Sequence, residues 1–178
     1  GPDTTSRFLR YNSKTKRWEP HGVIRSAQGN LQPAVAQLSD GRLIAYCRRG
    51  GGYEPTTSGY IIRAESTDGG RMWTEGKNTP FPNPNAAVEL LRLRNGHLLL
   101  IYNDSMNERT PLTVALSTDE DRTWPYRRNI AEGPFDYAYP FAIQTQDGKI
   151  HLVYTSHERT VINHVVFDEE WILQGTPR

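Results

Sequence analysis

The sequence lacks several features that would assign a protein class at once. It has a single cysteine, Cys47, so an internal disulfide is excluded and the redox compartment stays open. Its apolar runs are short, as at residues 98–102, and none is long enough to span a bilayer. The 21 basic and 20 acidic residues nearly cancel, which argues against a general nucleic-acid binder. We therefore expect a globular protein whose partners are neither nucleic acid nor membrane.

Long stretches that could form helices are also scarce. The 15 glycines and 12 prolines interrupt every segment that could hold three helical turns. The five histidines have no ligand spacing with cysteine or with paired carboxylates. The composition thus predicts an all-β protein with no helix beyond a turn or two, and it suggests neither a metal nor a cofactor.

A turn dipeptide recurs between apolar runs, at residues 38–44, 93–99 and 145–150. Each copy contains Asp-Gly or Asn-Gly, which favours a type I′ hairpin turn. The three copies repeat with a period of about fifty residues, the length of one propeller blade.

A second repeat lies between these hairpins. Residues 66–73, Ser-Thr-Asp-Gly-Gly-Arg-Met-Trp, recur at 117–124 as Ser-Thr-Asp-Glu-Asp-Arg-Thr-Trp. We expect the Asp of each copy to cap backbone N–H groups and the Trp to pack between strands. Asp121 stands where the first copy has glycine, so the second turn should be slightly altered.

Together the repeats predict a β-propeller of four-stranded antiparallel blades. Three blades are expected, at about 31–80, 84–130 and 138–174, which is half of a six-bladed ring. Residues 1–30 are interpreted as a tag remnant, with Gly1-Pro2 as a protease scar, followed by outer strands of a preceding or clasping blade. Localisation is left unknown. The most buried strands should contain 43–47, 98–102 and 150–154. Exposed blade faces at both ends predict that two copies associate to complete the ring.

Strand order places a set of polar side chains on one rim, away from the Trp-containing turns. In an antiparallel meander, the start of the first strand, the end of the second and the start of the third share an edge. The residues expected there include Gln32, Arg48, Arg109, Tyr137, Tyr139 and Arg159.

The S-x-D-x-G-x-x-W pattern of residues 66–73 resembles the Asp-box of BNR-repeat sialidase-like proteins, and the chain resembles the C-terminal half of that family. The resemblance implies an arginine group for the substrate carboxylate and a tyrosine nucleophile assisted by a glutamate. It matches Arg48 and Arg109 to substrate-binding arginines of the family and Tyr137 to the nucleophile. Tyr139 stands where typical sialidases carry Asp, and we interpret Tyr139 and Arg159, which share the rim, as further substrate-binding residues. An acidic, sialic-acid-like sugar is the implied ligand.

The chain departs from the family pattern where a base is needed. Gln32 occupies the position of the assisting glutamate, and an amide cannot accept the proton. The third arginine and the acid/base aspartate would belong to earlier blades. The resulting hypothesis is a sialidase-like glycoside hydrolase with an incomplete active site. A non-catalytic carbohydrate-binding or self-assembling scaffold propeller is the alternative, and a lyase or another glycosidase stays open, since a fold does not fix its chemistry.

Overall fold

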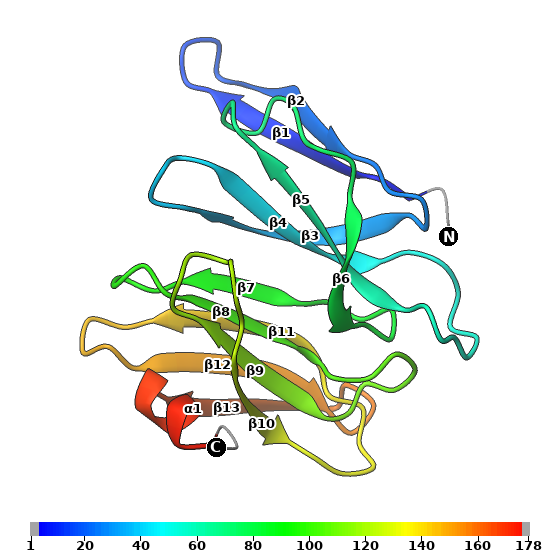
Figure 1. The fold of residues 1–178 in the computed structure, drawn as a ribbon. Coiled ribbons are helices and arrows are strands. Elements are labelled where there is room, and N and C mark those ends of the chain that lie inside the picture. The colour runs from blue at the N-terminus through cyan, green and yellow to red at the C-terminus, as the bar shows by residue number, and fades with distance from the viewer. Residues whose placement is uncertain (1–3, 176–178) are drawn as a thin grey trace.

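The computed structural model describes residues 4–175, which are all-β apart from one short helix (Figure 1). The strands form four antiparallel sheets in chain order. The hairpin consists of β1 (Ser6–Asn12) and β2 (Arg17–Ile24). The first sheet consists of β3 (Asn30–Gln37), β4 (Leu43–Arg49), β5 (Tyr60–Ser66) and β6 (Lys77–Pro82). The second sheet consists of β7 (Glu89–Arg92), β8 (Leu98–Asn103), β9 (Leu112–Ser117) and β10 (Tyr126–Ala131). The third sheet consists of β11 (Ala138–Gln144), β12 (Ile150–Ser156) and β13 (Val161–Phe167).

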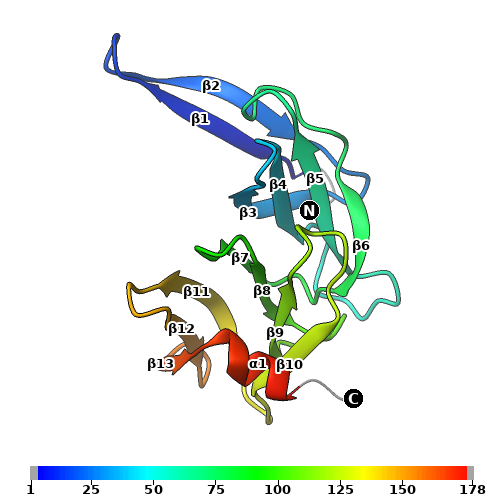
Figure 2. The same cartoon turned by 60° about the vertical axis from the view of Figure 1, so that its left-hand side comes forward.

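The three larger sheets pack face to face in chain order, and their first strands, β3, β7 and β11, lie next to one another along one side (Figure 2). One apolar cluster fills the space between the first and second sheets and includes Tyr46, Phe81 and Tyr102. Another fills the space between the second and third sheets, and a smaller one joins the hairpin to the first sheet. The second sheet is therefore covered on both faces, which explains why β8 and β9 are buried along their whole length.

The hairpin turns differ from the expected type I′. Gly41, Gly96 and Gly148 have positive φ, whereas Asp40 and Asn95 before them do not. The Gly41 N–H donates to the Leu38 carbonyl at 3.0 Å, and the Leu38 N–H donates to the Arg42 carbonyl at 2.8 Å. This pattern is a type I turn followed by a left-handed glycine, which needs three loop residues instead of two. The type I′ prediction was wrong, although the hairpins are where the dipeptides indicated.

The third sheet departs from the expected four strands. Within the described residues it has three, and α1 (Glu169–Gly175) follows β13 and packs on the second sheet instead. Arg128 holds the helix by donating to the Trp171 carbonyl at 2.7 Å, with its guanidinium 4.1 Å from the Trp171 ring centroid. The outer face of the third sheet is uncovered, so β12 alternates between buried and more exposed residues. Residues 150–154 are therefore not among the most buried, contrary to expectation, whereas 43–47 and 98–102 are.

The hairpin is a separate two-stranded sheet that packs on the first sheet. Phe8 stacks on Trp73 with ring centroids 4.9 Å apart. Ser26, just after β2, forms an isolated parallel bridge with Gly76. These contacts fix the hairpin against the β5–β6 side of the first sheet. Gly1-Pro2 lies outside the described residues.

The two Trp-containing turns use their aspartates as caps. Asp68 accepts hydrogen bonds from the N–H groups of Arg71 and Met72, at 3.1 and 2.9 Å. Asp119 accepts in the same way from Thr123, at 2.8 Å. Hydrogen bonds to the charged carboxyl lower both pKa values: the Met72 N–H is the main cause for Asp68, and the Thr123 hydroxyl followed by the Thr123 N–H for Asp119. The capping role expected from the sequence agrees with this geometry.

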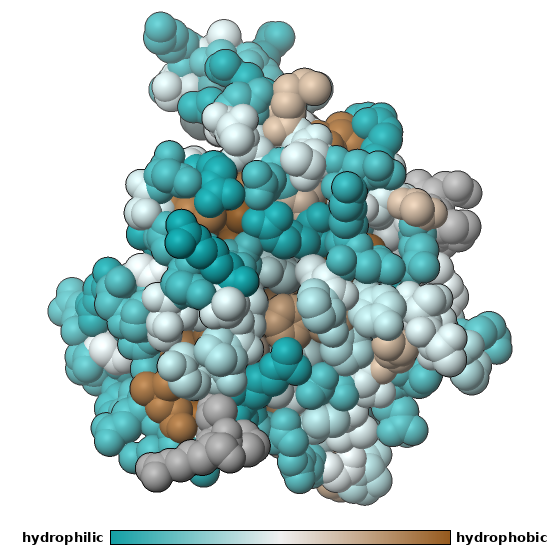
Figure 3. Space-filling model, viewed as in Figure 1, coloured by the Kyte–Doolittle hydropathy of each residue, from teal (hydrophilic) through white to brown (hydrophobic). Residues whose placement is uncertain are grey.

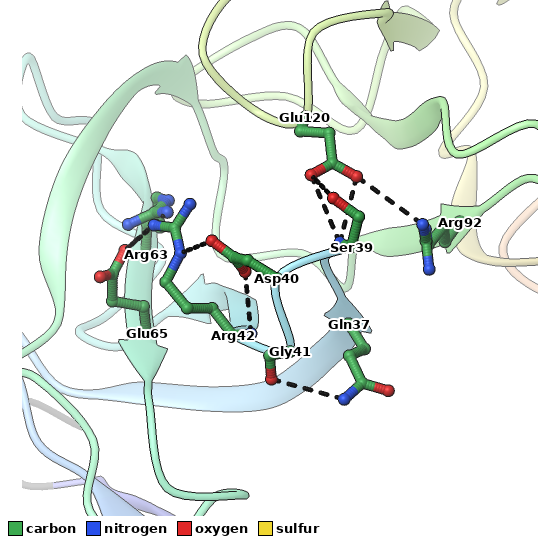
Figure 4. A network of polar contacts seen from close by, with 9 residues as sticks. All are labelled: Gln37, Ser39, Asp40, Gly41, Arg42, Arg63, Glu65, Arg92 and Glu120. Carbon is green, nitrogen blue, oxygen red and sulfur yellow. Dashed lines mark hydrogen bonds and ion pairs between the residues drawn. The ribbon is translucent and has the colours of Figure 1, made fainter.

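The second of these turns keeps its shape although it lacks both glycines. Glu120 and Asp121 have φ values of 58° and 75°, close to the 74° and 87° of Gly69 and Gly70. Such left-handed residues cost on the order of 1 kcal/mol or more. Glu120 offsets this by linking two sheets: it accepts from the N–H and hydroxyl of Ser39 and pairs with Arg92 (Figure 4). The expected alteration of the turn is therefore one of side-chain bonding and not of backbone shape.

Asp121 forms the second link. Its carboxylate is 4% exposed and pairs with the Arg63 guanidinium at 2.8 Å. It also accepts from the Tyr46 hydroxyl and from the Trp124 indole N–H, the latter at 3.0 Å. Burial, reinforced by this carboxylate, raises the pKa of Tyr46, which keeps its hydroxyl a donor. The residue that departs from the motif thus ties the first sheet to the second.

No helix among residues 4–175 is long and apolar enough to cross a membrane.

Candidate functional site

Three residues at equivalent places in the three sheets share an unusual backbone conformation. Gln32, Asn85 and Tyr139 have φ values of 49°, 59° and 54°, and each lies at or just before the first strand of its sheet. The pairing register shifts beside Gln32 and Tyr139, which marks a bulge. Left-handed conformations of non-glycine residues are strained and concentrate at binding sites. Here they turn three polar side chains toward one rim.

Arg48 is the centre of this rim. It is the second-last residue of β4, is only 6% exposed, and uses all three nitrogens of its guanidinium. It donates to the Asn85 side-chain oxygen at 2.7 Å, to the Gln32 side-chain oxygen at 2.8 Å and to the Tyr53 hydroxyl at 2.9 Å. All three acceptors are neutral, and no ion pair within residues 4–175 involves Arg48.

Arg109 reaches the same place from the loop between β8 and β9. It donates to the backbone carbonyl of Asn85 at 3.3 Å, so Asn85 holds both arginines, one through its side chain and one through its backbone. The Arg109 side chain is 10% exposed, and one of its terminal nitrogens is buried with no hydrogen-bond partner among residues 4–175. An unpaired buried guanidinium nitrogen is costly unless a ligand supplies the acceptor.

Tyr139 lies beside two guanidiniums and is 40% exposed. Its ring centroid is 5.5 Å from the guanidinium carbon of Arg109 and 5.8 Å from that of Arg159. Hydrogen bonding from Arg109 and the charges of the nearby arginines lower the pKa of Tyr139 below that of an ordinary tyrosine. Tyr139 is thus an accessible phenol in a positive environment.

One carboxylate lies between the outer two arginines. Asp136 is 3.8 Å from Arg109 and 3.6 Å from Arg159, both longer than a direct hydrogen bond. The loop from His157 to Arg159, which carries Arg159, has three successive residues with positive φ. Asp136 therefore partly balances the positive charge of this rim without closing a tight ion pair.

Tyr137 is not where the sequence placed it. The sequence predicts it on the rim with Arg48 and Arg109, and its backbone N–H does donate to the Arg109 carbonyl at 2.9 Å, but its side chain does not join them. Instead it is buried, donates its hydroxyl to the Glu132 carbonyl at 2.9 Å, and packs edge-on against Tyr154. In a regular strand Tyr137 and Tyr139, two positions apart, would point to the same side. The bulge at Tyr139 breaks this alternation, so the two side chains point in different directions.

The structure brings together five residues that we call the arginine cluster: Gln32, Arg48, Asn85, Arg109 and Tyr139. Arg159 lies at its edge, and Tyr137 lies beneath. Sequence reasoning did not assign Tyr53 or Asp136 to this site. The sequence does contain a signal that Tyr139 shares the backbone conformation of Gln32. Each of the two residues directly precedes a proline, Pro33 or Pro140, at matching places in the repeat. Among residues 4–175 no group of three or more His, Cys, Asp or Glu side chains is placed to hold a metal ion.

The fold and this rim define a class: an all-β protein of antiparallel meander sheets with a sialidase-like architecture. The model of the BNR repeat-like domain matches residues 4–152. The chain belongs to this BNR-repeat, sialidase-like family.

Individual relatives agree with this assignment. A sialidase from Micromonospora viridifaciens is 29% identical over 148 residues, which are 78% of this chain and 22% of that protein. The intramolecular trans-sialidase from Ruminococcus gnavus, solved with oseltamivir carboxylate, has a TM-score of 0.74 at 18% identity over 94% of this chain and 38% of that one. The leech intramolecular trans-sialidase, solved with 2,7-anhydro-Neu5Ac, has a TM-score of 0.74 at 15% identity over 94% of this chain and 28% of that one. The two structures show a shared fold. This chain spans less than half the length of each of these proteins.

Proposed function

We propose that the chain is part of a sialidase-like glycoside hydrolase and that its arginine cluster binds the carboxylate of an acidic sugar. The carrying observation is the buried, unpartnered nitrogen of Arg109 beside an Arg48 whose acceptors are all neutral. A guanidinium pairs with a carboxylate through two parallel hydrogen bonds, which satisfies both its charge and its donors. A sugar carboxylate is therefore the ligand group that best completes this rim.

Within this proposal Tyr139, and not Tyr137, faces the sugar as the nucleophile. Its exposure and its place between Arg109 and Arg159 support this role, because cations stabilise a developing phenolate. Tyr137 then supports the loop through its bond to the Glu132 carbonyl. Arg159 contributes charge at the open side of the cluster.

Catalysis by this chain should be slow or absent. The side-chain oxygen of Gln32 accepts from Arg48, and an amide cannot take up the proton of a tyrosine. A nucleophilic hydroxyl needs an adjacent base or a strongly lowered pKa. The site thus has carboxylate-binding groups and a nucleophile but no base for it.

The test is a pair of assays on the purified chain. Calorimetry should detect binding of N-acetylneuraminate, and a fluorogenic sialoside should show little or no turnover. Arg109→Ala should abolish binding, whereas the charge-matched control Arg122→Ala, on the other rim, should not. Rapid turnover would contradict the incomplete site, and absence of binding would contradict carboxylate recognition.

A non-catalytic scaffold or sugar-binding propeller is the second candidate, and Gln32 favours it. In that case Tyr139→Phe would leave sugar binding unchanged and no substrate would be turned over. Residual turnover that Tyr139→Phe removes would favour the hydrolase.

We also propose that the sheets are blades of a half-propeller and that a second copy completes a six-bladed ring. The outer face of the third sheet supports this, because it exposes large apolar side chains such as Phe141 at 61% and Ile162 at 75%. The outer side of the hairpin exposes Leu9 and Trp18 in the same way. Each face could cover the other in a closed two-fold dimer. A folded monomer at micromolar concentration, measured by light scattering, would count against this assembly.

A further inference from the structure

Positive charge is concentrated in the N-terminal hairpin. Residues 6–25 contain six basic residues and one acidic residue, Glu19, within a chain whose formal net charge is only +1. The remainder of the chain is therefore net acidic. The six basic residues are Arg7, Arg10, Lys14, Lys16, Arg17 and Arg25. All six are exposed, and so is Arg71, which the first Trp-containing turn places next to the hairpin. The top of the space-filling view, where the turn between β1 and β2 lies, is mainly hydrophilic (Figure 3).

These cations are not neutralised within the described residues. None of the ion pairs found there involves a basic residue of the hairpin or Arg71, whereas basic residues elsewhere, such as Arg42, Arg63 and Lys149, have carboxylate partners. The one hairpin carboxylate, Glu19, accepts from the Asn12 amide at 3.1 Å and from the Thr15 hydroxyl at 3.3 Å. Unpaired like charges at this density repel one another and favour an anionic partner.

Several of these groups line one groove of about 600 Å³. Arg10 lies on the same side of β1 as Phe8, which packs on Trp73, so Arg10 points toward the first sheet and not toward the outer side with Leu9. Arg71 forms the facing wall, where His21 bonds the Gly69 carbonyl at 2.8 Å. The groove is thus built by two segments that are far apart in the sequence.

The groove also offers groups that suit sugar hydroxyls. Its lining includes Asn12, Ser13, Tyr11 and Glu19 beside the cations. Glu19 repels any anionic group, but it can accept from a hydroxyl, which a polysaccharide offers along its whole length and the backbone of DNA does not. A ligand with both anionic groups and hydroxyl donors fits this mixture better than a nucleic acid does.

We propose that this groove and the adjoining hairpin turn bind a linear acidic polysaccharide. The cations Arg10, Lys14 and Arg71 would contact successive anionic groups of the polymer, and Glu19 and Asn12 would contact its hydroxyls. The surface lies at the rim of the Trp-containing turns, away from the arginine cluster, so it is a second binding region that does not depend on the first.

The test uses the full chain and a fluorescently labelled chondroitin sulfate, with anisotropy measured at several salt concentrations. The double variant Lys14→Gln/Arg71→Gln should bind about tenfold more weakly, with a shallower salt dependence, because two counter-ion-releasing contacts are lost. Its matched control is Lys77→Gln/Arg122→Gln, which removes two exposed charges outside the hairpin and should bind as the parent does.

Three outcomes would overturn the proposal. They are no binding by the parent chain, an equal loss in both double variants, and tighter binding of an oligothymidylate than of the polysaccharide. The Lys14→Gln/Arg71→Gln variant should still bind N-acetylneuraminate as the parent does. Failure of the groove and failure of the arginine cluster are therefore separable.

Discussion

Both rims of the molecule contain non-glycine residues with left-handed backbones, but these residues have different roles at the two rims. At the rim of the Trp-containing turns, Glu120 and Asp121 have left-handed backbones, and both carboxylates have partners. Glu120 accepts from Ser39, and Asp121 pairs with Arg63. At the other rim, left-handed Asn85 bonds both Arg48 and Arg109, whose positive charge is balanced only in part, by Asp136. Strain with satisfied charges stabilises the fold, whereas strain with unsatisfied charges indicates a ligand site.

This difference predicts that substitutions at the rim of the Trp-containing turns, the first rim, change stability. Substitutions at the rim of the arginine cluster, the second rim, should change binding. The largest stability effect is expected for Asp121→Asn. It removes the buried carboxylate charge that pairs with Arg63, while Arg63 keeps Glu65 as a second partner at 3.0 Å, so the free energy of unfolding should fall by about 2 kcal/mol. Urea denaturation followed by tryptophan fluorescence measures this. Glu120→Gln, at a more exposed pair, should change stability by less than about 1 kcal/mol. Equal losses in the two variants would contradict the distinction.

The matching experiment at the second rim is Arg48→Lys. Lysine keeps the charge but cannot donate at once to Gln32, Asn85 and Tyr53. N-acetylneuraminate affinity should fall about tenfold, which corresponds to about 1.4 kcal/mol. Calorimetry gives the affinity, and urea denaturation gives the stability, which should change less than in Asp121→Asn. A large loss of stability with unchanged affinity would make Arg48 a structural residue.

Repeats and turn chemistry made most of the fold predictable, while single torsion angles did not. The Asp-Gly and Asn-Gly dipeptides located the hairpin between the first two strands of each of the three sheets, and Asp68 and Asp119 located the caps, because these effects are local. Arg48 and Arg109 were found because strand order alone fixes which rim they share. Their meeting at Asn85 could not be foreseen.

What failed depended on context beyond the segment. Tyr137 and Tyr139 are both tyrosines in one short stretch, and only the sign of φ at Tyr139 decides which one faces the arginines. The exposure of β12 depends on whether another sheet covers it, and the replacement of a fourth strand by α1 depends on packing against Arg128. Such features arise from tertiary contacts that a repeat pattern does not contain.

A smaller effect on binding is expected from Asp136→Asn. Asp136 lies 3.8 Å from Arg109 and 3.6 Å from Arg159, so it competes with a ligand carboxylate for the same charges. Removing its charge should tighten N-acetylneuraminate binding about threefold at low salt, and the gain should shrink as salt is raised. Asp104→Asn, which changes a carboxylate on a neighbouring loop without an ion pair to Arg109, serves as the control. Weaker binding in Asp136→Asn would mean that Asp136 orients the arginines instead of competing for them.

The smallest expected effect is on the titration of Tyr139. Hydrogen bonding from Arg109 and the nearby guanidiniums favour the phenolate, so the pKa of Tyr139 in the folded chain is lower than in the unfolded chain. A group with a depressed pKa contributes stability that is present above its unfolded pKa and is lost as pH falls through its folded pKa. Folding stability should therefore gain slightly on the alkaline side, and only slightly, because the ring is partly exposed.

Ultraviolet absorbance of the phenolate follows this titration, and Tyr139→Phe identifies the signal by removing it. Arg109→Gln should move the remaining Tyr139 transition back toward the ordinary pKa, whereas Arg122→Gln on the other rim should leave it in place. An unchanged transition in Arg109→Gln would show that Arg109 does not act on Tyr139, and the proposed activation of this phenol by the arginine cluster would then fail even if sugar binding persisted.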